Sequence, residues 1–220
     1  NNLAVTSGTL DCGQKQLTGN ATGTFTMAAG TSLILGATSS TANVSFPTGF
    51  TAAHITLNAT STVTYQANTA QTVSVTPTTY GNLILSTGAS PTTKTPGGTP
   101  LNIAGNLTIN SNTTLSQSSN TISLTGNLTN SGTLLFSTGA FNINGNFTNN
   151  GTYTAGTNTT TLNGTAGQLI NGTSATTFYN LTATGNSSET VTLGNNETVS
   201  NNLLISAGTF DVSASNYSLT

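Results

Sequence analysis

Residues 101–150 decide the fold, and they read LNIAGNLTIN SNTTLSQSSN TISLTGNLTN SGTLLFSTGA FNINGNFTNN. One string recurs in this stretch: apolar, any residue, apolar, any residue, Gly, Asn, apolar. It begins at Leu101, at Ile122 and at Phe141, so its spacings are 21 and 19. Apolar residues at every second position predict short strands whose alternate side chains point to one side.

A second string extends the same period beyond this stretch. Gly-Thr followed by Leu, Phe or Tyr occurs at Gly8, Gly23, Gly132, Gly151 and Gly208. The spacings between the last three are 19 and three times 19. A period of this length accommodates three short strands and three turns. We therefore predict a three-sided parallel β-helix of roughly 11 coils, each about 4.8 Å above the last. Residues 21–79 follow this period less well, and no helical periodicity occurs.

The repeat also predicts the core. Leu107, Leu128 and Phe147 should stack in one column, because the spacings of 21 and 19 bring them into register. Thr suits the pleated outer surface, and stacked Asn side chains can form hydrogen-bonded ladders. The residues expected to point inwards are Leu101, Ile103, Leu107, Ile109, Ile122, Leu124, Leu128, Phe141, Ile143 and Phe147.

A longer period overlies the short one. Asn1–Asp11 and Asn201–Asp211 share six of eleven residues. Gln71 likewise corresponds to Gln168, and residues 80–83 correspond to residues 178–181. We interpret residues 1–220 as a single solenoid with internal blocks 1–104 and 105–200 and the start of a third block at 201–220. No capping segment is recognisable at either end, so we expect self-association end to end or continuation into a longer chain.

Composition excludes several classes of function. Charged residues make up 3% of the chain, with two Lys and no Arg, and the net charge is -2. Nucleic-acid binding needs a basic surface, so nucleic acid is not an expected partner. No apolar run approaches the roughly 20 residues that span a bilayer, so membrane insertion is not expected either. The chain opens on Asn1 without a signal-type segment, which is typical of a mature chain or an excerpt.

The repeats resemble those of large secreted bacterial β-helix surface proteins, namely filamentous haemagglutinin-like adhesins and autotransporter passengers. The resemblance is carried by residues 80–85 (YGNLIL), 105–109 (GNLTI) and 163–168 (NGTAGQ). It implies a right-handed β-helix, an extracellular or cell-surface location and an adhesive or structural role. It carries over no functional residue.

Catalysis is not expected from this inventory of side chains. Glycosidases need two carboxyl groups within several ångström, and the only acidic residues are Asp11, Glu189, Glu197 and Asp211. Asp11 and Asp211 should lie at opposite ends of the rod. Glu189 and Glu197 could approach around a corner, although two solvated loop charges are the simpler interpretation. Lys15 and Lys94 are isolated.

No cofactor or metal site is expected, so catalytic, cofactor-binding and metal residues are all predicted to be none. His54 is the only histidine and lacks partner ligands, so it should be a satisfied or exposed polar residue. Cys12 is the only cysteine. It could pair between molecules, but a small buried apolar role is more common. The stretch from Pro91 to Pro100 could be a linker, and we favour a corner loop bulging from one coil.

Surface glycans are the alternative partner, supported only by aromatic residues such as Tyr65, Tyr80, Phe178 and Tyr179, most of which alternate with inward positions. Ice binding would need a Thr-x-Thr pair in every coil. Such pairs occur within residues 22–26, 60–64, 157–161 and 190–192, but they are missing from 101–110 and 122–130. Polysaccharide degradation is the remaining minor alternative.

Glycosylation is also open, because sequons of the form Asn-x-Ser/Thr are frequent in a chain so rich in these residues. They occur at Asn20, Asn43, Asn58, Asn106, Asn112, Asn127, Asn146, Asn150, Asn158, Asn163, Asn171, Asn180, Asn186, Asn196 and Asn216.

Overall fold

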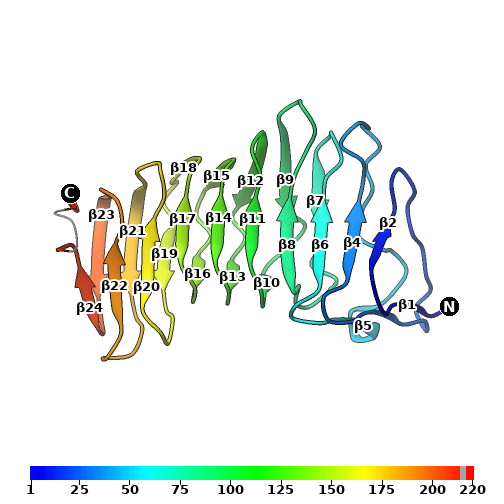
Figure 1. Cartoon of the computed structure of the whole chain (residues 1–220), viewed down its shortest axis with the longest axis horizontal. Coiled ribbons are helices and arrows are strands. Elements are labelled where there is room, and N and C mark those ends of the chain that lie inside the picture. The colour runs from blue at the N-terminus through cyan, green and yellow to red at the C-terminus, as the bar shows by residue number, and fades with distance from the viewer. Residues whose placement is uncertain (214–216) are drawn as a thin grey trace.

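The computed structural model describes residues 1–213 and 217–220, and it winds the chain into a parallel β-solenoid of about ten turns (Figure 1). The strands of the front sheet in Figure 1 run upwards, and the chain returns behind them as it advances from right to left, which is a right-handed winding. This winding confirms the predicted all-β solenoid. The sequon at Asn216 lies outside the described residues.

Three sides enclose the core. The front side is one ten-stranded sheet, called the long sheet here. In spatial order it contains β2 (Thr9–Asp11), β4 (Ser32–Leu35), β6 (Thr62–Tyr65), β8 (Asn82–Leu85), β11 (Leu107–Ile109), β14 (Leu128–Asn130), β17 (Phe147–Asn149), β20 (Gln168–Asn171), β22 (Thr190–Leu193) and β24 (Thr209–Asp211).

Strands of the second side precede the long-sheet strand of a coil, and strands of the third side follow it in the coils between residues 71 and 154. The second side consists of β1 (Leu3–Val5), β3 (Phe25–Met27) and β5 (Ile55–Leu57), and then of β10 (Leu101–Ile103), β13 (Ile122–Leu124), β16 (Phe141–Ile143), β19 (Thr159–Leu162), β21 (Thr177–Ala183) and β23 (Thr198–Ile205). The third side consists of β7 (Gln71–Val73), β9 (Thr92–Pro96), β12 (Thr113–Ser118), β15 (Thr133–Phe136) and β18 (Thr152–Thr154).

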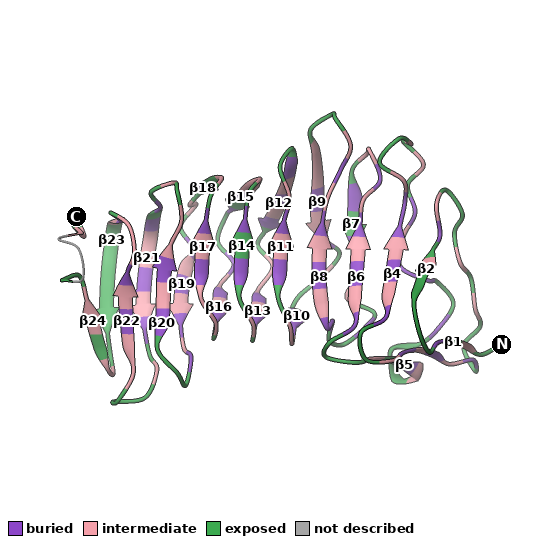
Figure 2. Ribbon diagram, in the orientation of Figure 1, coloured by how far each residue is buried: buried purple, intermediate pink, exposed green. Residues whose placement is uncertain are grey.

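The register confirms the predicted column. Leu107 pairs with Leu128, and Leu128 pairs with Phe147. All ten residues expected to point inwards are buried, and Figure 2 shows buried positions alternating along the strands of each coil. A parallel strand that lies directly above its neighbour repeats the same inward and outward positions, so a fixed spacing in sequence becomes a straight column in space.

The coil number differs from the prediction, because the first coils are longer than the repeat. Phe25 pairs with Ile55, and Leu33 pairs with Val63, so the spacing between strand partners is wider here than in the second half. The extra length lies between β4 and β5, where the chain carries Phe46 and Phe50 into the core and forms a 3-10 turn at Ala52–His54. Ten turns rather than 11 follow from these insertions.

The segment from Pro91 to Pro100 is neither a linker nor simply a corner loop. Residues Thr92–Pro96 form β9, which pairs with β7 on one side and β12 on the other. The corner-loop interpretation was wrong for residues 92–96, and the proline is tolerated because Pro96 has a strand partner on one side only, Val73.

Polar side chains form two ladders along the axis, as expected for Asn at corners. On the outer face, the side-chain oxygens of Asn82, Asn106 and Asn127 accept backbone N–H bonds of 2.8–2.9 Å from the asparagine one coil later, the last of which is Asn146. Inside the rod, the Asn130 amide donates to the Asn149 oxygen over 2.8 Å. Both ladders join successive coils through side chains as well as through strands.

Candidate functional site

The two glutamates that could have formed a catalytic pair lie at different corners. Glu189 directly precedes β22, and Glu197 follows it, so the strand separates them. Asp11 and Asp211 belong to the first and last strands of the long sheet. The structure therefore does not bring the predicted carboxyl groups together.

Glu197 is buried, which corrects its interpretation as a solvated loop charge. One of its carboxyl oxygens accepts a hydrogen bond from the backbone N–H of Thr176, and the other, Oε1, is buried with no hydrogen-bond partner. Burial raises the pKa of Glu197 from 4.5 to about 7, although the Thr176 hydrogen bonds oppose this shift. The sequence did not predict the burial of Glu197, because this residue follows two asparagines, Asn195 and Asn196, which are typical of an exposed loop.

The side chain of Glu197 ends a buried polar chain. The Asn149 amide donates to the Thr176 hydroxyl over 3.2 Å, and Thr176 in turn contacts Glu197. The backbone of Glu197 pairs with the C-terminal segment, because its N–H donates to Ser218 O over 3.0 Å and its carbonyl accepts from Thr220 N over 3.2 Å. The carboxyl group therefore lies under the last coil.

Lys94 is also buried, which the sequence analysis did not predict. Its ammonium group donates to Ala67 O at 2.7 Å, to Thr69 O at 2.9 Å and to Gln71 Oε1 at 2.7 Å. Burial lowers its pKa to about 8. The three acceptors satisfy the three N–H groups of the ammonium, so Lys94 fastens β9 to the coil beneath it.

Gln71 and Gln168 make the same clamp, although they belong to different sides. Each side-chain oxygen accepts the N–H of the residue four positions earlier, at 3.0 and 2.8 Å. Each amide also donates to two carbonyls of a preceding coil. The two glutamines that correspond in sequence therefore stabilise a corner of the coil through the same set of hydrogen bonds.

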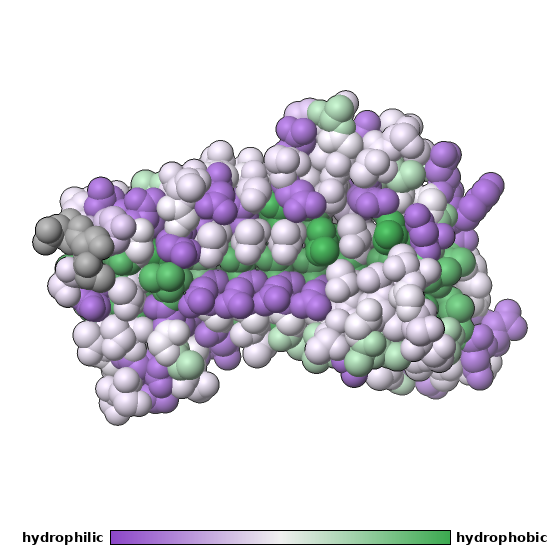
Figure 3. All heavy atoms as spheres, viewed as in Figure 1, coloured by the Kyte–Doolittle hydropathy of each residue, from purple (hydrophilic) through white to green (hydrophobic). Residues whose placement is uncertain are grey.

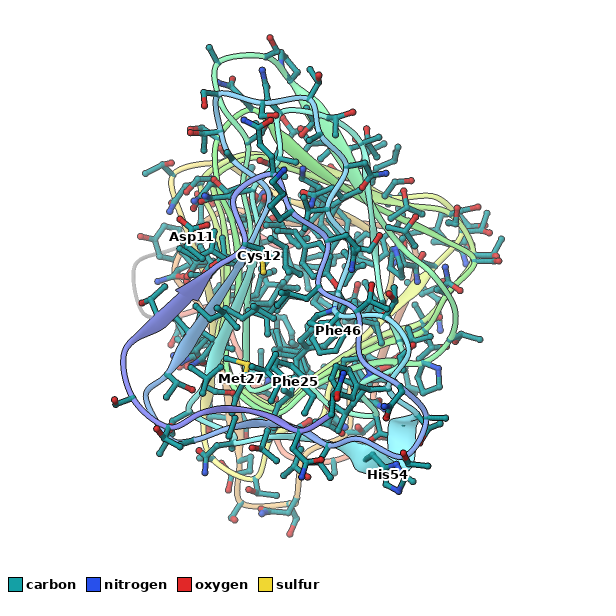
Figure 4. All side chains as sticks on the ribbon, turned by 90° about the vertical axis from the view of Figure 1, so that its right-hand side faces the viewer. Asp11, Cys12, Phe25, Met27, Phe46 and His54 are labelled. Atoms are coloured by element: carbon teal, nitrogen blue, oxygen red, sulfur yellow. The ribbon has the colours of Figure 1, made fainter. Side chains whose placement is uncertain are left out.

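Figure 4 shows the first coils from the N-terminal end, with Cys12 pointing into the core and His54 at the periphery. Cys12 is buried and unbridged, which confirms the apolar interpretation. Burial, together with the nearby charge of Asp11, raises the pKa of its thiol to about 11. His54 is satisfied, since its Nδ1 lies 2.8 Å from Ala21 O. Among the described residues, no group of three or more His, Cys, Asp or Glu side chains could hold a metal ion.

The outer face of the long sheet carries a straight row of hydrophilic side chains (Figure 3). The asparagines of the outer ladder form this row, and beside it lie Thr108, Thr129 and Thr148 in one column. The same column contains Ile84 and Asn171, so the Thr array is interrupted at both ends. The sequons at Asn106, Asn127 and Asn146 lie in this row.

The Thr-x-Thr pairs proposed for ice binding do not share a face. Thr26 belongs to β3 and Thr161 to β19 on the second side, whereas Thr64 and Thr192 belong to β6 and β22 of the long sheet. In each strand the Thr residues alternate with inward-facing residues such as Val63 and Val191, and the strands lie on different sides. The sequence-based candidates therefore do not build one flat array.

The aromatic side chains offered for glycan binding are mostly core residues. Tyr65, Tyr80 and Phe178 are buried, and Tyr179 is half-buried. The Tyr65 and Tyr80 hydroxyls are 2.9 Å apart, and Tyr80 donates to Ser74 O over 2.7 Å. A groove of about 380 Å³ lies between the loop at residues 45–50 and the loop at residues 72–76, but the Phe46 and Phe50 rings that line it are buried. These rings do not form an exposed stacking surface.

The last strands of the rod carry most of the exposed large apolar side chains. Four of the five exposed large apolar residues in the described part of the chain lie there: Leu203 at 38%, Leu204 at 48%, Ile205 at 46% and Val212 at 37%. Figure 2 shows β23 as exposed.

Two core columns end at this surface. Leu203 follows Phe141, Thr160 and Leu181 in one column, and Ile205 follows Ile143, Leu162 and Ala183 in the other. The earlier members of both columns are buried. They are buried because a further coil covers each of them, and no described strand covers residues 203–205.

No family model, no curated protein and no solved structure matches the chain. None of the described helical segments has the length and apolar character needed to cross a membrane.

Proposed function

We propose that the chain is a structural and adhesive β-solenoid of the extracellular space or cell surface, forming part of a longer rod. The observation that carries this proposal is the continuity of the core. Apolar columns run through successive coils with the same geometry, so the architecture can be extended by further coils of the same kind.

The surface chemistry supports an extracellular scaffold. Thr, Asn, Ser and Gly make up 128 of the 220 residues, and only six side chains are Lys, Arg, Asp or Glu. Two of those six, Lys94 and Glu197, are buried inside the rod. Inter-coil contacts made by uncharged amides depend little on ionic strength, because salt screens charges rather than neutral hydrogen bonds. We therefore expect the rod to keep its structure over a wide range of salt concentrations.

A labelling experiment tests this proposal. Antibodies raised against the purified chain should label intact cells of the source organism without permeabilisation, and beads coated with the chain should adhere to surfaces that uncoated beads leave bare. Label that appears only after permeabilisation would exclude the surface location. Surface label without adhesion would reduce the role to a structural one.

A further inference from the structure

We propose that the groove between residues 45–50 and residues 72–76 is a docking site for a short, uncharged peptide segment in extended conformation. The segment would add a strand to the free edge of β7, so that backbone hydrogen bonds contribute to its recognition. This inference goes beyond the proposed structural role and does not depend on it.

The first argument is an interruption of the third side in the middle of stacked coils. On one wall of the groove, Thr48 is paired with the preceding coil, because its N–H donates to Leu17 O over 3.0 Å and it forms a parallel bridge with Thr18. On the other wall, β7 is paired with β9. The sheet nevertheless ends at β7, and a groove of about 380 Å³ separates the two walls. Small-ligand sites have volumes of about 300–1,000 Å³, so this groove is large enough for a ligand.

The second argument is a free donor and a free acceptor at this edge of β7. The alternative phase of the ladder to β9 would require an N–H on Pro96, which has none, so the ladder uses the backbone groups of Gln71 and Val73. The Gly97 N–H accordingly donates to Val73 O over 2.8 Å. The N–H and C=O of Thr72 therefore point away from β9, and Thr72 lines the groove. An added strand supplies the matching acceptor and donor.

The third argument is that buried side chains fix both ends of the groove. At one end, the Gln71 amide donates to Val44 O over 2.7 Å, so a side chain joins the two coils there. At the other end, the Tyr65 hydroxyl accepts the Ser74 N–H over 3.0 Å, and the Tyr80 hydroxyl donates to Ser74 O over 2.7 Å. The tyrosines thus hold the chain that follows β7 against the core. Walls that are fixed before binding lose little conformational entropy when a ligand enters.

The fourth argument is the chemistry of the lining. None of the residues that line the groove, all of them in the described part of the chain, is charged. A charged ligand would lose hydration there without gaining an ion pair. Half-buried Val75 offers apolar surface to a side chain of the ligand. A neutral sugar fits less well, because Phe46 and Phe50 are buried, with Phe46 turned towards the core (Figure 4), and neither offers a ring face for stacking.

Titration of the isotope-labelled chain with a peptide tests the docking by nuclear magnetic resonance. The probe is the acetylated and amidated hexapeptide TTLSQS, which is uncharged and forms the extended β12 in the same sheet. We expect saturable shifts of the amide signals of Thr72 and Val75. No saturable shift at Thr72 would overturn the proposal. Maltotriose is titrated in parallel, and a response of these amides to the sugar alone would overturn the choice of a peptide.

Two N-methylated forms of the peptide test the backbone pairing and leave the protein unchanged. Each form carries N-methyl groups on alternate residues, in opposite phases, so only one form blocks the peptide edge that faces Thr72. That form should bind at least about fivefold more weakly than the other, because the loss of one partner of a buried hydrogen bond has at least this cost. Equal affinities of the two forms would refute strand addition.

A substitution that fills the groove tests its location. Ser45→Trp places a large side chain in the groove and should abolish the saturable shift at Thr72. Ser116→Trp is the matched control, because Ser116 is also half-buried on the third side but lines a different groove, of about 420 Å³, beside β15. Thermal melting checks that both variants are folded. Equal binding of the peptide by the two variants would overturn the proposed location.

Discussion

Replacing Phe147 by Ala should leave a cavity in the core of the rod. The Phe147 side chain is fully buried between Leu128 and Ile170 in the long-sheet column. Its ring centroid lies 5.4 Å from that of Phe178 and 5.9 Å from that of Tyr153. A Phe-to-Ala change in a core costs about 3–5 kcal/mol. Because the ring also packs against two aromatic neighbours, we expect a loss in the upper part of that range, about 4–5 kcal/mol.

Guanidinium unfolding followed by circular dichroism measures this loss. The midpoint should fall while the slope stays constant, provided that unfolding remains cooperative. Phe147→Leu is the control, because Leu107 and Leu128 occupy the same column, and it should cost less than about 1.5 kcal/mol. A loss below about 1 kcal/mol for Phe147→Ala would show that this column does not stabilise the rod.

Three further substitutions test the polar interior. The raised pKa of Glu197 means that the folded state holds the carboxyl proton more tightly than the unfolded state. The free energy of unfolding should therefore fall by about 2–3 kcal/mol as the pH rises from about 4.5 to about 7. Thermal melting across this pH range should show no such fall for Glu197→Gln, whereas Glu189→Gln should show the same fall as the wild type. Lys94→Met should cost about 2–4 kcal/mol in urea unfolding, because it removes the ammonium donor from the buried carbonyls of Ala67 and Thr69 and leaves the Gln71 oxygen with the Ala67 N–H alone; the exposed Lys15→Met should change stability by less than about 0.5 kcal/mol. Asn127→Ala should lower the free energy of unfolding by about 1 kcal/mol, because it removes the oxygen that accepts the Asn146 N–H in the outer ladder. Asn127→Asp keeps an acceptor oxygen and should retain most of the wild-type stability in the same assay. Equal losses for the two variants would argue against a stabilising role of the ladder.

The repeats of residues 101–150 were sufficient to predict the strands, the stacking and the column from Leu107 to Phe147. Inward and outward positions alternate with a period of two, and a parallel coil transmits that alternation unchanged to the next coil. Local pattern and global fold therefore coincide in this half of the rod. In residues 21–79 the sequence pattern does not predict the fold. Insertions make the first coils longer than the repeat, and no periodic pattern shows which of the inserted residues pack into the core.

The candidate functional residues and surfaces could be predicted only in part. The match between Asn1–Asp11 and Asn201–Asp211 pointed to a repeated coil, but not to the side chains left exposed there. Leu203 and Ile205 follow the same alternation as buried residues elsewhere. Their exposure depends on whether another coil lies above them, which is a property of neighbours in space.

Composition and repeat spacing thus determined the fold class, the three sides and the register of residues 101–150. Only the tertiary structure decided the burial of Lys94 and Glu197 and the separation of Glu189 from Glu197. The physical reason is the same in each case. A strand's periodicity says which way a side chain points, whereas its solvation, its pKa and its partners depend on the coils above and below, which no local pattern encodes.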